Sequence, residues 1–153
     1  MTNEEFARHI SDVQSSMYRV AKAILKNDED CADAIGEAVL HAFDKIDTLK
    51  KEKYFKTWLI RILLNECYKI LNSRHEEVFL EEYMEKSEEN VMYSEVFEAV
   101  MKLDELYRIP FVLHYVEGYS TKEIADILSI SVSNVKIRLQ RARIKLQDML
   151  KGE

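Results

Sequence analysis

The sequence has 153 residues, of which 47% are hydrophobic and 33% are charged, with 3 Gly and 1 Pro. This composition can bury a core and contains few helix breakers, so we expect a mostly helical protein of one domain or two small ones. The N-terminus lacks the features of a signal peptide, and no stretch approaches the roughly 18 uninterrupted apolar residues of a membrane span. We therefore expect a cytoplasmic protein without direct membrane insertion.

The formal charge of −6 comes from one segment of the chain. Residues 1–75 hold 12 basic and 12 acidic side chains, and residues 95–153 hold 9 of each, whereas residues 76–94 hold 1 and 7. Residues 131–145 contain five basic side chains and no acidic one. This local basic segment, on a chain that is otherwise neutral or acidic, indicates a surface for nucleic acid.

The cysteine and histidine spacing favours neither a disulfide nor a metal site. Cys31 and Cys67 do not form a CxxC pair, and the four histidines do not cluster with them in the sequence. We find no catalytic constellation and expect no cofactor, so the sequence predicts a protein that is not an enzyme.

Three amphipathic helices are expected in the N-terminal half, over residues 5–27, about 30–46 and about 54–72. The third should bury one side, composed of Phe55, Leu59, Ile62, Leu63, Ile70 and Leu71. Its other side gathers, within about 100° of arc, the residues Trp58, Arg61, Asn65, Tyr68 and Lys69. An aromatic ring, cations and an amide on one face can bind unstacked bases. The open alternative is that Trp58 caps the core and the other side chains are solvated.

Residues 73–94 are rich in Glu and lack long periodicity, which predicts a flexible linker. Helix should resume at Ser94. Because Pro110 fits only the first turn of a helix or a kink, we expect a break within 104–108 and a helix over about 108–117. Gly118 should end that helix.

A helix-turn-helix is predicted near the C-terminus. Ser120 and Glu123 have the spacing of a capping box, and residues 129–131 form a short turn in which Ser131 can cap the next helix. The inward seam of this second helix should contain Val135, Leu139, Ala142, Leu146, Met149 and Leu150. The far side should present Ser133, Ile137, Gln140, Arg141 and Ile144, flanked by Lys136 and Arg143 on one edge and by Arg138 and Lys145 on the other.

Such a face suits a major groove, because an exposed Ile137 can contact a thymine methyl and the flanking cations can reach phosphates. The alternative is an amphipathic C-terminal helix whose basic face is merely solvated.

Two sequence blocks carry a family resemblance. EGYSTKEIADILSISVSNVKIRLQRARIKL resembles the region of group IV, or extracytoplasmic function (ECF), sigma factors that recognises the minus-thirty-five element. Their polymerase-binding and minus-ten-recognising regions resemble DCADAIGEAVLHAF and YFKTWLIRILLNECYKIL. Within the family, the sequence is most similar to Firmicutes members of the sigma-V kind. The resemblance implies an all-α protein of two small helical domains. These are a three- or four-helix sigma region 2 bundle over 1–74 and a sigma region 4 helix-turn-helix over 95–153, joined by an acidic flexible linker over 75–94.

The resemblance also implies roles for particular residues. The surface for the polymerase clamp coiled coil would be Asp33, Glu37, Leu40 and Phe43. Asn65 would line the pocket for a flipped minus-ten base, surrounded by Trp58, Arg61 and Lys69. The minus-thirty-five contacts would be Ser133, Lys136, Ile137, Arg138, Gln140, Arg141 and Arg143. Three residues depart from the family pattern. Gly36 lies where many members have Gln, and Ser129 lies in the turn where many have Gly. Gln140 lies where some members have an aromatic residue.

The resemblance implies a factor that directs promoter-specific transcription initiation, in a cell-envelope stress response. Its partners would be core RNA polymerase, through the clamp coiled coil and the flap, promoter DNA as duplex and melted strand, and a membrane-linked anti-sigma factor. Two alternatives stay open at this point. One is a stand-alone helix-turn-helix regulator that does not dock on polymerase, and the other is an adaptor that uses the helical face of residues 30–46 for protein binding.

Overall fold

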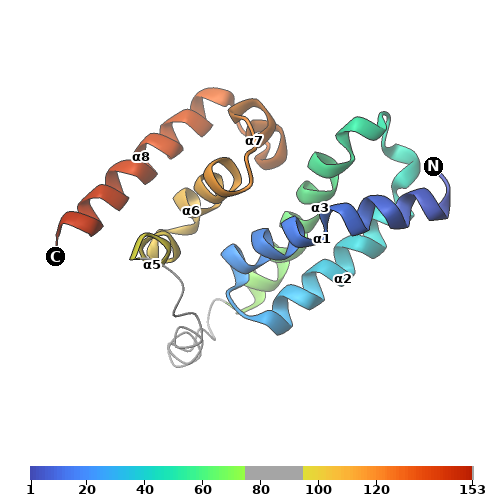
Figure 1. Cartoon of the computed structure of the whole chain (residues 1–153), viewed down its shortest axis with the longest axis horizontal. Helices are drawn as coiled ribbons and strands as arrows, with labels where there is room; N and C mark the ends of the chain where they lie inside the picture. Colours follow the sequence, from blue (N-terminus) through green and yellow to red (C-terminus); the bar gives the residue numbers. More distant parts are fainter. Residues whose placement is uncertain (75–94, 153) are drawn as a thin grey trace. The chain divides into compact units, whose positions relative to one another are not determined.

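The computed structural model describes residues 1–74 and 95–152 and divides the chain into two units, Met1–Glu77 and Val78–Glu153 (Figure 1). In the described ranges all regular structure is helical. The boundary between the units falls within the predicted linker, whose residues 75–94 lie outside the described residues. The linker and the domain bounds therefore stay predictions, and each unit is treated by itself below.

Unit 1 is a bundle of three long helices, α1 (Asn3–Leu25), α2 (Asp28–Asp44) and α3 (Phe55–Arg74), each of which packs on the other two. Two short 3-10 turns, η1 (Ile46–Thr48) and η2 (Glu52–Tyr54), connect α2 to α3. A capping box of Thr2 and Glu5 starts α1, and the Asn27 side chain caps α2 by accepting from the Asp30 N–H at 2.8 Å. The core includes Met17, Ile24, Leu59, Ile60 and Leu63.

The buried side of α3 is broader than the predicted stripe. Ile60, Leu64 and Cys67 are buried although the stripe omitted them. Three members of the predicted stripe are only half-buried, namely Ile62, Ile70 and Leu71. The reason is that α3 contacts both α1 and α2, so two neighbours cover a wider arc of its surface than one would.

Unit 2 consists of α5 (Glu95–Lys102), α6 (Glu105–Phe111), the π-helical turn η3 (Val112–Val116), α7 (Thr121–Leu128) and α8 (Val132–Lys151). The long α8 packs against α5, α6 and α7 (Figure 1). The fully buried side chains of unit 2 include Leu103, Leu113, Ile124 and Val135. None of the described helices of either unit is both long enough and apolar enough to span a membrane.

The predicted start of the helix around Pro110 was wrong. The helix α6 begins at Glu105, so Pro110 lies inside it rather than in its first turn. Proline has no N–H to donate within a helix, and directly after it the chain changes to the wider π pattern, in which the Glu117 N–H donates to the Val112 carbonyl at 3.0 Å. Gly118 then ends the helix with a φ of 79°, as predicted.

Candidate DNA and polymerase interfaces

Both helices of the helix-turn-helix begin at a side-chain cap. The Ser120 hydroxyl accepts from the Glu123 N–H at 3.1 Å, and the Glu123 carboxylate accepts from the Ser120 N–H at 2.9 Å, which completes the predicted capping box. Ser131 caps α8 by accepting from the Asn134 N–H at 3.0 Å. Between the helices Ser129 adopts the left-handed conformation, with φ of 57° and ψ of 45°. This conformation is why glycine is favoured at such a turn position.

The two sides of α8 are divided as predicted over its first four turns. Its inward side is buried and comprises Val135, Leu139, Ala142 and Leu146. Ile137 on the opposite side is 45% exposed, although it is one of the larger apolar residues of the helix. The predicted inclusion of Leu150 in the inward seam was wrong, since this residue is 39% exposed. Near the end of α8, Met149 and Leu150 line an open hollow beside α5, so the last turn is only partly covered.

The predicted minus-thirty-five residues share one surface of α8. All are exposed except Arg138, which is half-buried; the exposed ones are Ser133, Lys136, Ile137, Gln140, Arg141 and Arg143. The Arg138 Nε donates to the Asn134 Oδ1 at 3.2 Å, which fixes its guanidinium along one edge. On the other edge, the Arg143 Nη1 donates to the Tyr115 hydroxyl at 2.7 Å. Sequence reasoning missed Tyr115, because no local pattern connects residues 28 positions apart.

The predicted minus-ten residues lie along α3. Arg61, Asn65 and Lys69 are exposed, and Trp58 is half-buried with its ring centroid 5.8 Å from that of Phe55. The indole therefore covers part of the core and still presents part of its surface to solvent. Both interpretations of Trp58 agree with this position, so its role in DNA binding stays a prediction.

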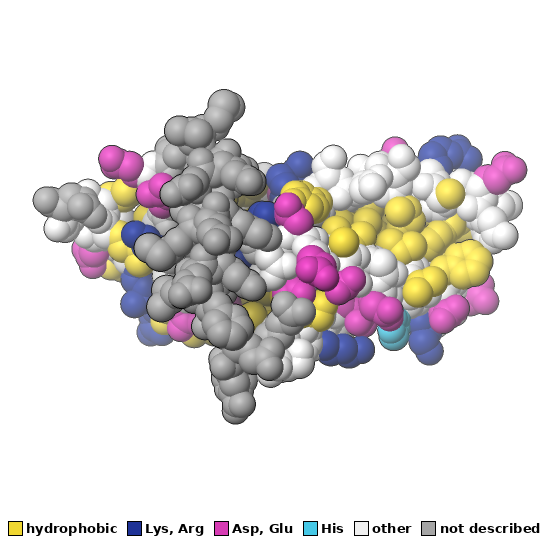
Figure 2. Space-filling view, turned by 90° about the horizontal axis from the view of Figure 1, so that it is seen from below, with side chains coloured by type: hydrophobic (Ala, Val, Ile, Leu, Met, Phe, Trp, Pro, Cys, Tyr) yellow, Lys and Arg dark blue, Asp and Glu magenta, His cyan; other side chains and the backbone are white. Residues whose placement is uncertain are grey.

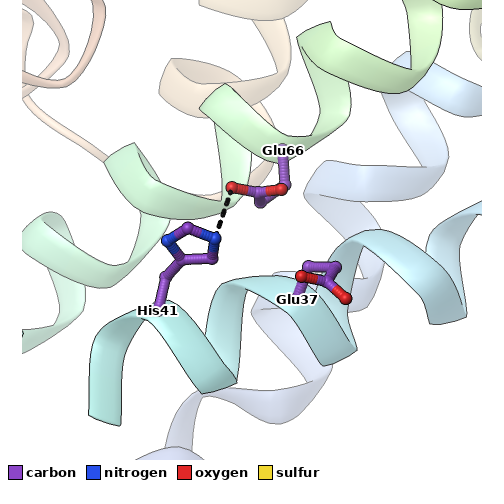
Figure 3. Close-up of side chains that lie close together, drawn as sticks. All are labelled: Glu37, His41 and Glu66. Carbon is purple, nitrogen blue, oxygen red and sulfur yellow. Dashed lines mark ion pairs between the residues drawn. The ribbon is translucent and has the colours of Figure 1, made fainter. Parts of the chain in front are cut away.

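Glu66 connects α3 to α2. Its side chain is buried, and its carboxylate is 3.6 Å from His41 Nε2 (Figure 3). The same carboxylate is 3.2 Å from the Lys69 ammonium. Glu37 lies one turn from His41 on α2, and within the described ranges these three residues bring potential metal-ligand atoms within 4.8 Å of one another. We assign no metal to them, because the Glu66 carboxylate is already paired with the Lys69 ammonium and the other two groups are exposed. The sequence offered no signal for this network, since a carboxylate between exposed positions on α3 was not expected to be buried.

The predicted polymerase surface lies on α2. Asp33 and Glu37 are exposed, and two large apolar side chains beside them are also in contact with solvent, Leu40 at 61% and Phe43 at 48%. The Phe43 ring meets the buried Phe6 ring edge-on, with centroids 5.4 Å apart, so it is held in place by the core. Apolar side chains gather on one face of unit 1 in Figure 2, with acidic side chains along their border. A surface of this kind is typical of a protein-binding site.

Comparisons with known proteins agree with this arrangement. A family model for sigma-70 region 2 matches residues 9–76, and one for sigma-70 region 4 matches residues 93–146. The chain is 26% identical to the ECF RNA polymerase sigma factor SigW of Bacillus subtilis, over 97% of this chain and 90% of that protein. It is also 26% identical to the RNA polymerase sigma factor SigV of the same species, over 87% of this chain and 83% of that protein.

Two solved structures share the fold. One is the sigma factor RpoE in complex with the anti-sigma factor NepR from Bartonella quintana, with a TM-score of 0.78 and 22% identity over 97% of this chain and 98% of that one. The other is CnrH in complex with the cytosolic domain of CnrY, with a TM-score of 0.79 and 24% identity over 99% of this chain and 91% of that one.

A region 2 followed by a region 4 in one chain is the architecture of a sigma factor for transcription initiation, and sigma factors are regulators rather than enzymes. This pairing does not favour a stand-alone helix-turn-helix regulator, which would not need region 2. The chain belongs to the sigma-70 family, as a member of its group IV of ECF sigma factors.

Proposed function

We propose that this sigma factor uses the exposed side of α8 to contact the duplex minus-thirty-five element. The observation that carries the proposal is the exposure of Ile137 among cations while the opposite side of the same helix is buried. An exposed isoleucine gains no burial from the core, whereas a thymine methyl in a major groove can cover it. Arg141 and its neighbours can then donate to base edges or to phosphates on the groove walls.

The face of α3 binds the melted minus-ten strand. Asn65 is exposed at its middle and can donate to and accept from the edge of a flipped base. Arg61 and Lys69 supply positive charge for the backbone, and the open part of the Trp58 ring gives a surface for stacking. Unstacking a base costs a few kcal/mol, so a receptor that is already in place favours promoter opening.

The face of α2 docks on the clamp coiled coil of core RNA polymerase. Leu40 and Phe43 supply apolar contact area, and Asp33 and Glu37 supply charges at its edge. Unit 2 binds the polymerase flap, a partner that the family resemblance supports. The solved complexes of RpoE with NepR and of CnrH with CnrY support an anti-sigma factor as a further partner, and we propose that a membrane-linked one masks these surfaces in the cytoplasm.

Polymerase docking makes promoter binding strong. The formal charge of −6 opposes attraction to phosphates, and each small unit offers few contacts, so the free chain binds DNA weakly. Once polymerase holds both units on one promoter, the second contact becomes intramolecular, and the two weak contacts act as one stronger contact.

The test is transcription in vitro with core polymerase, on a promoter selected by the holoenzyme from a random-sequence library. Asn65→Ala should impair strand opening, measured by permanganate reactivity, more than closed-complex formation. Arg141→Ala should weaken promoter binding by about 1–3 kcal/mol if the guanidinium contacts a base. Gln147→Ala, an exposed position of α8 outside the predicted contacts, is the matched control and should change neither step.

Three results would contradict the proposal in different ways. Absence of promoter-dependent initiation with core polymerase would refute sigma activity. Tight duplex binding by the chain alone would favour a stand-alone regulator. Normal initiation after charge reversal of both Arg138 and Arg141 would show that α8 does not read DNA, leaving protein binding as the role of the chain.

A further inference from the structure

The hydrogen bond between Arg143 and Tyr115 connects the predicted DNA surface to a different element. Arg143 belongs to α8 and Tyr115 to the π-helical turn, and the 2.7 Å bond between the guanidinium and the hydroxyl lies at the surface of unit 2. Tyr115 is 49% exposed, and its bond to Arg143 is also exposed. The aromatic ring therefore lies at the edge of the proposed DNA surface.

The position of the Tyr115 ring is set by its neighbours. Its centroid lies 4.7 Å from that of Phe111 and 4.8 Å from that of His114, the latter in an edge-on arrangement. His114 is itself held, because its Nδ1 lies 2.8 Å from the Tyr119 carbonyl oxygen. A side chain that is packed on two sides loses little conformational freedom when it binds a ligand.

The π-helical turn explains why an aromatic residue lies at this place. A regular α-helix through Pro110 would continue with 3.6 residues per turn, whereas the π pattern of residues 112–116 widens the turn and changes the direction of its side chains. Single π turns of this kind are frequent at functional sites. The sequence around Tyr115 carries no motif that would have assigned it to DNA.

We propose that Tyr115 is a positioning residue of the minus-thirty-five surface that acts through Arg143. This proposal rests on the proposed function of α8. A tyrosine hydroxyl has two acceptor lone pairs and one hydrogen to donate. It accepts from Arg143 and holds the guanidinium at the edge of α8, where this cation is expected to bind a phosphate. The guanidinium has five N–H donors, so the bond to Tyr115 leaves others directed at the phosphate.

The opposite edge of α8 offers a matched comparison. There the Lys145 ammonium lies over the Tyr107 ring, 5.3 Å from its centroid. This cation–π contact is made with the face of the ring and does not involve the hydroxyl. Removing the Tyr107 hydroxyl should therefore leave its cation in place. Removing the Tyr115 hydroxyl should release Arg143.

The experiment measures binding of the full chain to a labelled duplex of about 30 base pairs and mixed sequence by fluorescence anisotropy at low salt. A mixed sequence is adequate because phosphate contacts do not depend on base identity. Tyr115→Phe should weaken binding about three- to tenfold, the range expected for loss of one ordinary hydrogen bond. Arg143→Ala should weaken it further and lower the slope of log K against log salt by about 0.9, the value for one lost phosphate contact.

The double variant decides whether Tyr115 acts through Arg143. In the Arg143→Ala background, Tyr115→Phe should change binding by less than about twofold, because the hydroxyl then has no guanidinium to hold. Tyr107→Phe is the control and should bind as the wild type. Thermal unfolding of all variants should agree closely, which separates a binding effect from a folding effect.

The results separate the role of Tyr115 from the proposed function of α8. Unchanged binding by Tyr115→Phe, or an equal effect in the presence and absence of Arg143, would overturn the role of Tyr115 while leaving the DNA surface of α8 intact. Unchanged binding by both Arg141→Ala and Arg143→Ala would instead overturn the proposed function of α8 itself.

Discussion

Replacement of Gly36 by alanine should stabilise unit 1. Gly36 is the ninth residue of the 17-residue α2 and is exposed. A Cβ built at this position has no heavy atom within 4 Å outside its own helix turn and chain neighbours, so the methyl group meets no steric conflict. Glycine in a helix interior is about 1 kcal/mol less favourable than alanine. The full propensity difference should therefore appear as added stability, a change of about fivefold in the unfolding equilibrium constant.

Trp58 makes this change measurable in unit 1 alone. It is the single tryptophan of the sequence and lies in α3, so urea or heat unfolding followed by its fluorescence reports on this unit. For a domain of this size, 1 kcal/mol corresponds to an increase in Tm of about 4–8 °C. Ala32→Gly, at another exposed position of α2, is the reverse control and should lower stability by a similar amount.

An unchanged or lower Tm for Gly36→Ala, together with the expected loss for Ala32→Gly, would refute the reasoning. It would mean that residue 36 is not in regular helix or that its environment in solution is more crowded. Transcription with core polymerase adds an independent readout, because Gly36 lies between Asp33 and Glu37 of the proposed clamp-binding face. A variant that is more stable but initiates poorly would show that polymerase approaches the backbone closely here.

The remaining predictions concern packing, capping and thiol chemistry. Leu139→Ala should destabilise unit 2 by about 2–5 kcal/mol and Ile137→Ala by less than about 0.5, as measured by thermal unfolding followed by circular dichroism; the reverse order would mean that α8 is turned the other way. Ser120→Ala removes the acceptor for the Glu123 N–H and should lower the stability of unit 2 by about 1 kcal/mol in the same assay, whereas Ser120→Thr should retain most of it. Burial raises the pKa of Cys67 from 9.0 to about 12, so this thiol stays protonated at pH 8 and should react with a disulfide reagent only as fast as the fold opens. Equal reaction rates of Cys67 in the native and urea-unfolded chain at pH 8 would contradict this.

The helix-turn-helix was predictable from sequence because its determinants are local. The capping box spans four residues, and the turn contains a position at which the left-handed conformation is favourable only for a few residue types. The buried positions of α8 repeat at the helical period, so Leu139 and Ala142 identify the inward side and Ile137 the outward side without any tertiary information. The predicted polymerase-binding residues on α2 came instead from the family resemblance.

Where the sequence prediction failed, contacts between elements were responsible. Ile60 and Leu64 are buried because a second helix packs on α3. Leu150 is exposed because the last turn of α8 is only partly covered by the other helices of unit 2. Glu66 is buried beside Lys69 of α3 and His41 of α2, and no spacing within α3 could indicate the contact with α2. The start of α6 was misplaced because proline was expected only in a first turn or at a kink.

Contacts with neighbouring side chains also distinguish the cations of the two proposed DNA surfaces. The Lys69 ammonium is paired with the Glu66 carboxylate, so a phosphate must compete with an existing ion pair for it. Arg143 is bound instead by a neutral hydroxyl, which orients the guanidinium without neutralising its charge. A phosphate that binds Lys69 thus meets a cation that already has a carboxylate partner, whereas one that binds Arg143 does not. This difference suits a factor whose duplex contact forms first and whose contact with the melted strand follows once polymerase holds the promoter in place.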